Sequence, residues 1–162
     1  MLLKSSFSYN CYKSEKNLPI IDQKLFRFCD NAIKDAYSIY SGFSVGASLL
    51  LENGKIYSAN NQENSAFPSS MCAERVLLYN TRANHPKLAI KKIAISVKSI
   101  HGDLKKPVSP CGACRQVMVE YEQKQKFPIE ILLKGGQGMI YVIKSAEDLL
   151  PLVFQPNLKT NE

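Results

Sequence analysis

Apolar residues recur at two spacings along the 162-residue chain, and each spacing predicts a kind of element. Segments with apolar residues at every third or fourth position are typical of helices that bury one face. Runs rich in β-branched residues and bounded by turn-forming residues are typical of strands. The helical spacing covers residues 20–40, 71–83 and 111–124. The strand-like runs cover residues 45–51, 55–59, 90–99, 128–134 and 139–144, with an Asn53–Gly54 turn joining the first two.

The order of these segments predicts the fold class. Helices that alternate with strands favour an α/β fold, here a three-layer α/β/α sandwich with a mixed five-stranded sheet. A further short helix is expected over residues 146–154, where Ser145 can cap the first turn and Pro151 limits the length. Residues 1–17 are polar, and we expect an irregular N-terminal arm there. Neither a repeat nor a shift in composition divides residues 1–162, which predicts a single domain.

Composition and charge narrow the class of protein. Hydrophobic residues make up 45% of the chain and charged residues 22%, which is enough apolar material for a packed core. The apolar runs are too short to cross a bilayer, and Lys4, Ser5 and Ser6 interrupt the apolar start that a signal peptide needs. We therefore expect a cytoplasmic protein without a membrane partner. The net charge of +7 would permit attraction to nucleic acid, but the lysines occur in scattered pairs, which argues against such a partner.

Three of the five cysteines occupy the same structural situation. Cys72 falls at the start of one predicted helix, and Cys111 and Cys114 fall at the start of the next. The N–H groups and partial positive charge of a helix start stabilise thiolates, and thiolates bind zinc. Three protein ligands leave a fourth position on zinc open, which is the arrangement of catalytic sites. Glu74 is placed to move a proton there, and Arg75 to offset the charge of the thiolates.

The same cysteines allow two other interpretations. A Cys-x-x-Cys pair at a helix start could be a redox pair, although that leaves the Cys72–Ala73–Glu74 segment without a role. A purely structural zinc site would need a fourth ligand from Cys11, Cys29, His85 or His101. None of these four residues stands in a pair with ligand-like spacing. A disulfide framework is disfavoured, because the cysteine count is odd and a reducing compartment is expected.

Two segments carry a resemblance to a known family. Cys72–Ala73–Glu74, together with Pro110–Cys111–Gly112–Ala113–Cys114, resembles the zinc-dependent nucleoside and nucleobase deaminases. Within that superfamily the chain is similar to the small homotetrameric cytidine deaminases. The similarity runs from about Tyr40 to Phe154, in the segments YSGFSVGA, NQENSAFPSSMCAER, PVSPCGACRQV and LLPLVF.

The resemblance implies a cytidine deaminase-like fold, one zinc ion per chain and a particular reaction. The reaction is the hydrolytic deamination of cytidine and deoxycytidine to uridine and deoxyuridine with release of ammonia, in pyrimidine salvage. A homotetramer with active sites shared between subunits is also implied. The zinc ligands would be Cys72, Cys111 and Cys114. Glu74 would be the proton shuttle, and Arg75 would hydrogen-bond the ligand sulfurs.

The resemblance also implies substrate contacts. Asn61 and Glu63 match the pair that holds the ribose 3′-hydroxyl. Phe43 matches the aromatic residue that packs against the pyrimidine, and the backbone of Ala73 matches the group that contacts the base carbonyl. Read without the resemblance, Phe43 would be an ordinary core residue and Asn61 a turn residue.

A last group of matched positions reaches the active site of a neighbouring subunit. Phe154 matches an aromatic residue that the neighbour supplies, and Ser65 and Phe67 match loop positions near the 5′-hydroxyl. Alanine and tyrosine are common at the two loop positions in similar enzymes. Phe67 has no hydroxyl, so it cannot make a contact that depends on the tyrosine hydroxyl.

Three other functions are left as alternatives. The chain could deaminate a nucleoside antibiotic of the blasticidin S type, or a nucleic-acid base. Enzymes of the second kind usually carry histidine where Cys72 stands, and the Asn61–Gln62–Glu63 segment with Phe43 favours cytidine over the antibiotic. A zinc-binding module without activity is the third alternative. The intact Glu74 argues against it, because a structural site has no use for that carboxylate.

Overall fold

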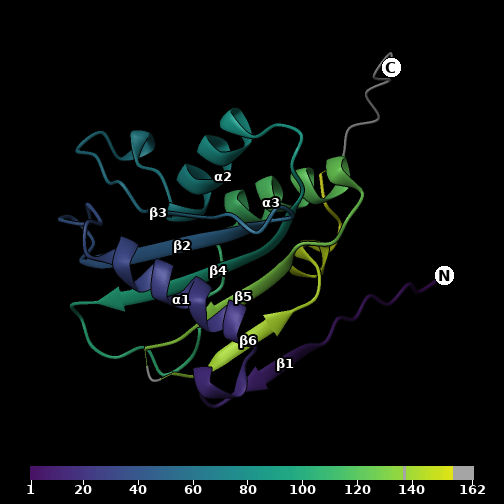
Figure 1. Cartoon of the computed structure of the whole chain (residues 1–162), viewed down its shortest axis with the longest axis horizontal. Coiled ribbons are helices and arrows are strands. Elements are labelled where there is room, and N and C mark those ends of the chain that lie inside the picture. The colour runs from purple at the N-terminus through teal and green to yellow at the C-terminus, as the bar shows by residue number, and fades with distance from the viewer. Residues whose placement is uncertain (137, 155–162) are drawn as a thin grey trace.

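A computed structural model describes residues 1–136 and 138–154 of the chain (Figure 1). The strands in these residues are β1 (Tyr9–Tyr12), β2 (Phe43–Leu51), β3 (Ile56–Asn60), β4 (Ile90–Ser99), β5 (Glu130–Lys134) and β6 (Ile140–Ile143). They form a single six-stranded sheet in the order β1-β6-β5-β4-β2-β3. β4 and β5 run parallel, whereas the other neighbouring pairs are antiparallel, so the sheet is mixed as expected.

Helices cover both faces of this sheet. The α-helices of the described residues are α1 (Ile20–Ile33), α2 (Ala73–Asn84) and α3 (Gly112–Gln125). Short 3-10 helices are η1 (Glu15–Asn17), η2 (Phe67–Ser69) and η3 (Ala146–Leu149). α1 packs on one face, and α2 and α3 lie together on the other (Figure 1). Across the described part of the chain, the helices all fall short of the length and apolar character needed to span a membrane.

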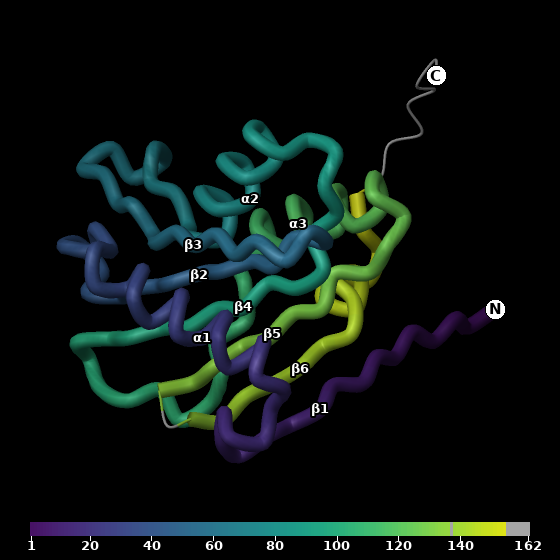
Figure 2. Tube along the Cα trace, viewed as in Figure 1, coloured from purple at the N-terminus to yellow at the C-terminus, as the bar shows by residue number. Residues whose placement is uncertain are grey.

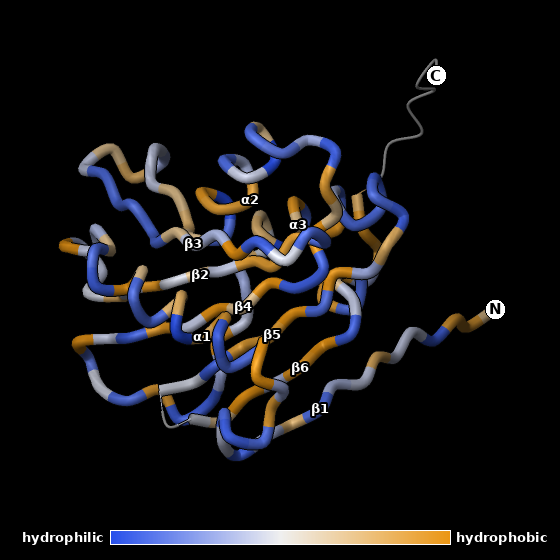
Figure 3. Tube along the Cα trace, viewed as in Figure 1, coloured by the Kyte–Doolittle hydropathy of each residue, from blue (hydrophilic) through white to orange (hydrophobic). Residues whose placement is uncertain are grey.

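The sheet divides the core into two hydrophobic clusters. Leu49 and Leu51 of β2 pack with α2 and α3, whereas Leu50 between them packs with α1. β4 alternates in the same way, with Ile93 in the first cluster and Ala94 in the second. Because successive strand residues point to opposite faces, a strand covered on both faces is apolar almost throughout. Figure 3 shows this hydrophobic colouring along most of β5 and β6.

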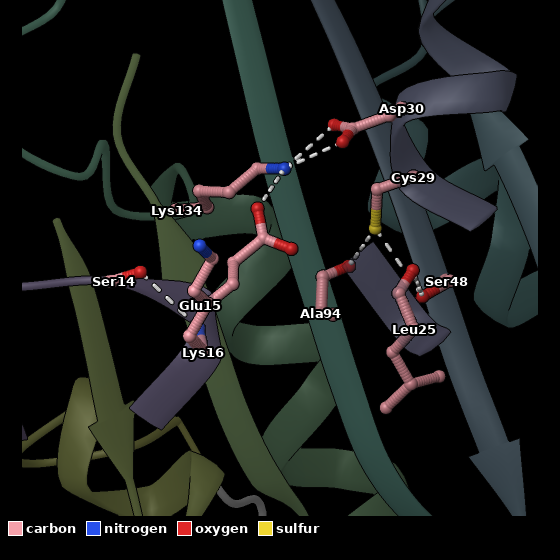
Figure 4. A network of polar contacts seen from close by, with 9 residues as sticks. All are labelled: Ser14, Glu15, Lys16, Leu25, Cys29, Asp30, Ser48, Ala94 and Lys134. Atoms are coloured by element: carbon pink, nitrogen blue, oxygen red, sulfur yellow. Dashed lines mark hydrogen bonds and ion pairs between the residues drawn. The ribbon is translucent and has the colours of Figure 1, made fainter. Parts of the chain in front are cut away.

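The helix α1 lies against β2 with little space between the two backbones. A Cβ atom at Gly46 would lie 2.2 Å from the carbonyl oxygen of Cys29, so only glycine fits there. The Cys29 Sγ lies 3.3 Å from the Ser48 hydroxyl and 3.2 Å from the carbonyl oxygen of Ala94 (Figure 4). Burial raises the pKa of the Cys29 thiol to about 12. Cys29 is therefore a protonated core residue rather than a metal ligand.

The sheet has six strands rather than the predicted five, and the additional strand is β1. This strand lies within residues 1–17, where the sequence predicted an irregular arm. Its residues are mostly exposed, so they lack an apolar pattern, and the strand forms by pairing with β6 at the sheet edge (Figure 2). The Tyr9 and Tyr141 rings contact each other across this pair, with centroids 4.7 Å apart. Such a non-local contact cannot be recognised from local sequence.

An ion-pair cluster fastens the amino-terminal segment and α1 to the sheet. The Lys134 Nζ of β5 lies 2.9 Å from the Glu15 carboxylate of η1 and 2.7 Å from the Asp30 carboxylate of α1 (Figure 4). Burial alone would lower the pKa of Lys134, but the hydrogen bonds that it donates to the two carboxylates outweigh burial and raise that pKa. The lysine is therefore charged, and it holds η1 and α1 against the end of β5.

Two predicted helices end earlier than expected. α1 stops at Ile33 rather than near residue 40, because the Tyr37 backbone pairs with the segment after β3 instead. The Tyr37 N–H donates to the Asn61 carbonyl at 3.0 Å, and the Tyr37 carbonyl accepts from the Glu63 N–H at 2.8 Å. The helix expected over residues 146–154 is reduced to η3, because a proline soon follows and cannot supply the next N–H donor.

Glu122 of α3 is a buried carboxylate that joins three elements. It accepts hydrogen bonds from the N–H groups of Ile129, Ala146 and Glu147, and from the Ser145 hydroxyl. These donors stand directly before β5 and at the start of η3. The carboxylate therefore fixes both elements to α3 and satisfies donors that are shielded from water.

Replacing Glu122 with alanine is expected to lower the free energy of unfolding by roughly 3 kcal/mol. Hydrogen bonds to a charged group contribute about 1.5–3 kcal/mol each, and here the donors would lose their acceptor. Urea or thermal unfolding measures the loss. Glu120→Ala removes an exposed carboxylate from the same helix, and this control should change stability by less than about 0.5 kcal/mol. Equal stability of the two variants would contradict the role given to Glu122.

Candidate active site

Two helix starts bring three cysteines together. Cys72 is the residue immediately before α2, Cys111 holds the same position before α3, and Cys114 lies in the first turn of α3. The Cys72 Sγ lies 3.8 Å from the Cys111 Sγ, which lies 3.3 Å from the Cys114 Sγ. All three sulfurs fall within 4.8 Å of one another. The structure thus contains the sulfur cluster that the sequence predicted.

The spacing of the sulfurs suits zinc. Zinc binds thiolate sulfur at about 2.3 Å with tetrahedral geometry, which places two ligand sulfurs about 3.8 Å apart. The separations of 3.8 and 3.3 Å are close to this value. Within the described residues the cluster has three members, so a tetrahedral ion would keep one position for a ligand from outside the protein.

The charges around the sulfurs also suit a cation. Hydrogen bonding from Cys114 lowers the pKa of Cys72 to about 5, helped by Arg75 and Cys111. The Arg75 Nη2 lies 3.9 Å from the Cys72 sulfur. The pKa of Cys114 is raised by its hydrogen bond to Cys72 and by burial. Three thiols this close cannot all ionise by themselves, because each thiolate raises the pKa of the next, and a divalent cation between them removes that penalty.

Glu74 stands in the first turn of α2, close to the cluster, and its side chain is almost inaccessible to water. The residue is 5% exposed, and burial, together with the charge of Cys72, raises the pKa of its carboxyl. It lines the same cavity as Cys72 and Cys111. A raised pKa makes a carboxylate a stronger base, so Glu74 is better able to take up a proton and pass it on, as general acid–base catalysis requires.

A cavity of about 390 Å³ adjoins the cysteines and Glu74. Cavities of about 300–1,000 Å³ are the usual size of small-ligand sites. The apolar lining residues are Phe43, Val45, Met71, Ile95, Val97 and Val108. The polar lining residues include Ser41, Asn61, Gln62, Glu63, Ser70 and Ser109. A cavity lined by both apolar and polar side chains suits a flat base joined to a hydroxylated group.

Comparison with known proteins agrees with this site. Residues 19–129 match the family model described as the cytidine and deoxycytidylate deaminase zinc-binding region. The chain belongs to this family. The match begins after β1 and η1 and ends before β5, so it includes the three cysteines and Glu74.

Individual deaminases resemble the chain over most of its length. It is 40% identical over 132 residues to the cytidine deaminase of Halalkalibacterium halodurans, which covers 82% of this chain and 92% of that protein. Identity to the cytidine deaminase of Sporosarcina psychrophila is 41% over 99 residues, which covers 61% of this chain and 68% of that protein. The crystal structure of the Burkholderia pseudomallei cytidine deaminase superposes with a TM-score of 0.69 at 36% identity, covering 82% of this chain and 98% of that one.

The two residues that the deaminase resemblance assigns to the ribose lie on the cavity wall. Asn61 is held by β2, since its Oδ1 accepts from the Val45 N–H at 2.7 Å and its Nδ2 donates to the Phe43 carbonyl at 2.9 Å. The Glu63 carboxylate accepts from two backbone N–H groups and from the Ser41 hydroxyl. These hydrogen bonds lower the pKa of Glu63, and the bond from the Ser41 hydroxyl has the largest effect. The fold therefore fixes both side chains.

The other residues assigned to the substrate are placed differently. Ala73 is buried and lies between two residues that line the cavity. Ser65 and Phe67 are exposed between β3 and α2, where the Phe67 side chain is 69% exposed. Phe154 is 73% exposed. Ser65, Phe67 and Phe154 are absent from the wall of the cavity beside the cysteines. Phe67 instead lines a neighbouring cavity, which shares Ser41, Glu63 and Ser70 with the first.

Several residues of the cavity wall were not predicted from the sequence. Met71, Val108 and Ser109 line the cavity and stand close in the chain to zinc-ligand candidates. These three residues lie in the NQENSAFPSSMCAER and PVSPCGACRQV segments that resemble the deaminases, and this position was the signal that could have identified them. Ser41 also lines the cavity, and its place beside Phe43 in YSGFSVGA was a comparable signal.

Proposed function

We propose that this chain is a zinc-dependent cytidine deaminase, which replaces the C4 amino group of cytidine to give uridine and ammonia. The observation that carries the proposal is the buried Glu74 beside the three-cysteine cluster, on the wall of a cavity of nucleoside size. Membership of the deaminase family and the similarity to proteins named cytidine deaminases support the same reaction. Deamination of a blasticidin-type antibiotic or of a nucleic-acid base has no comparable support.

Different residues of the chain have different roles in the proposed reaction. One zinc ion held by Cys72, Cys111 and Cys114 would supply a Lewis acid that lowers the pKa of a water molecule. Glu74 takes a proton from that water and passes it to N3 of the base as hydroxide adds to C4. Glu74 then moves a proton from the added hydroxyl to the amino group, which leaves as ammonia. Arg75 offsets part of the thiolate charge, which favours ionisation of the water.

The cavity wall supports a free nucleoside as the substrate. In this proposal Asn61 and Glu63 bind the ribose 3′-hydroxyl, Phe43 packs on the pyrimidine, and the Ala73 backbone contacts the base carbonyl. The first three of these residues line the cavity. Because deoxycytidine carries the same 3′-hydroxyl, it should be a second substrate and give deoxyuridine. The activity would serve pyrimidine salvage in the cytoplasm.

The proposal includes a homotetramer with shared active sites. Its support is the placement of Phe154 and Phe67, which are large apolar side chains with exposures of 73% and 69%. Phe67 packs edge-on against the exposed Tyr40, with ring centroids 5.7 Å apart. Aromatic residues are enriched in surfaces that a second subunit covers, so large exposed aromatic side chains such as these are candidates for such a surface.

Purified protein is expected to convert cytidine to uridine and to contain about one zinc ion per chain. The ultraviolet spectrum of cytidine followed over time measures the conversion, and metal analysis measures the zinc. Adenosine, blasticidin S and a short tRNA, assayed in parallel, should remain unchanged. Zinc-loaded protein that leaves cytidine unchanged would overturn the proposal, and a response in a parallel assay would then identify the substrate class.

A further inference from the structure

The Ser41 hydroxyl joins two residues that are proposed to contact the substrate. It donates a hydrogen bond to the Glu63 carboxylate and accepts one from the Phe43 N–H at 3.0 Å. Phe43 opens β2 and Glu63 follows β3, so the two bonds connect separate segments. All three residues line the 390 Å³ cavity. One small side chain therefore links the proposed ribose side of the cavity to the proposed pyrimidine side.

The hydrogen bonds of Glu63 leave room for a ligand. Its Oε2 accepts from the Tyr40 N–H at 2.8 Å and from the Ser41 N–H at 3.3 Å, and its Oε1 accepts from the Ser41 hydroxyl. An ionised carboxylate offers about four acceptor positions, so about one position on Oε1 is left for a ligand hydroxyl. Glu63 can thus accept a single hydroxyl from a fixed direction.

The loop that carries Ser41 is also held by the segment after β4. The Ile100 N–H donates to the Gly42 carbonyl at 3.0 Å, and the His101 Nε2 donates to the Ser41 carbonyl at 3.1 Å. Gly42 has a φ of +62°, and a Cβ atom there would lie 2.4 Å from the Ile100 side chain. These contacts hold one side of the loop, and the hydrogen bonds to Glu63 hold the other side, so the Ser41 hydroxyl stands in a defined place between Glu63 and Phe43.

We propose that Ser41 is a positioning residue for nucleoside recognition, which aims Glu63 at the ribose 3′-hydroxyl and sets Phe43 against the base. The inference rests on the proposed function. Ser41 does not touch the reacting atoms, so losing its hydroxyl weakens the binding of substrate and of transition state alike. Such a loss raises KM and leaves kcat little changed.

Three variants test this role. In Ser41→Ala, KM for cytidine is expected to rise roughly tenfold, with kcat changed by less than about twofold. The preference for cytidine over 3′-deoxycytidine, measured as a ratio of kcat/KM values, should fall by a similar factor because Glu63 is no longer aimed. Ser41→Thr keeps the hydroxyl and should restore both values. Ser38→Ala removes a hydroxyl of the same loop, which bonds Ser44 at 2.8 Å instead of Glu63, and should leave both values unchanged.

If Ser41→Ala keeps the same preference for cytidine over 3′-deoxycytidine, the proposal is overturned. It is also overturned if Ser38→Ala loses that preference to the same extent, because such a loss would indicate general loosening of the loop. A second measurement needs no turnover. Chymotryptic cleavage after the exposed Tyr40 should accelerate in Ser41→Ala but not in Ser41→Thr or Ser38→Ala, and equal rates would also overturn the proposal. If the unmodified protein leaves cytidine unchanged, the proposed function fails, and the cleavage rates still decide whether Ser41 holds the loop.

Discussion

Replacing Glu74 with glutamine is expected to abolish cytidine turnover while the fold and the zinc stay in place. Glutamine has nearly the same shape but cannot take up and release protons. General acid–base catalysis contributes about 10²–10⁴-fold, and Glu74 is proposed to carry every proton transfer, so the loss should lie at the upper end of this range or beyond it. The carboxyl is buried and its pKa is raised, so a neutral amide should be tolerated there.

The Glu74→Gln variant is checked by three measurements on one preparation. These are kcat for cytidine, zinc content and the thermal unfolding temperature. Glu120→Gln makes the same chemical change at an exposed position of α3 and should leave all three values unchanged. Substantial turnover by zinc-loaded Glu74→Gln would show that another group moves the protons.

Cys111→Ala should remove both the metal and the activity. Two remaining thiolates leave a zinc ion with too few protein ligands, so zinc content should fall from about one ion per chain to a small fraction. Cytidine turnover should fall by at least about a hundredfold as a consequence. Metal analysis after gel filtration, followed by the cytidine assay, measures both effects.

Cys11→Ala is the matched control for the cysteine variant. Cys11 is also exposed, but it lies on β1 and outside the three-sulfur cluster. This variant should therefore keep its zinc and its turnover. Full zinc occupancy in Cys111→Ala would show that other side chains complete the site, and the assignment of the three cysteines would then be wrong.

Helices and strands that bury their own side chains show it as a pattern of apolar residues, so they could be predicted from the sequence. The strand predicted over residues 90–99 is β4 with the same bounds, and residues 93–97 are all buried, which explains why this run is apolar except at Ser96. β1 could not be predicted, because its exposed residues take strand geometry only by pairing with β6, far along the chain. The end of α1 was missed for a similar reason, since Tyr37 pairs with the segment after β3.

The same distinction applies to the candidate active site. The cysteines and Glu74 could be found because helix starts fix their positions locally, and two such starts meet. The bridging role of Ser41 could not be found, because its hydrogen bond to Glu63 spans 22 positions of the chain. Serine and glutamate are also common on surfaces, so neither residue type points to the contact.

The pairing of β1 with β6 decides which strand the sheet presents at its edge. The edge is formed by the short, mostly exposed YNCY segment rather than by the apolar IYVI segment of β6. An uncovered apolar strand is a template for pairing with other molecules. A shortened chain beginning at residue 19, where the family match begins, would keep the cysteines and Glu74 but lose that cover. Such a chain would be prone to precipitate, so β1 protects the solubility of the protein rather than its chemistry.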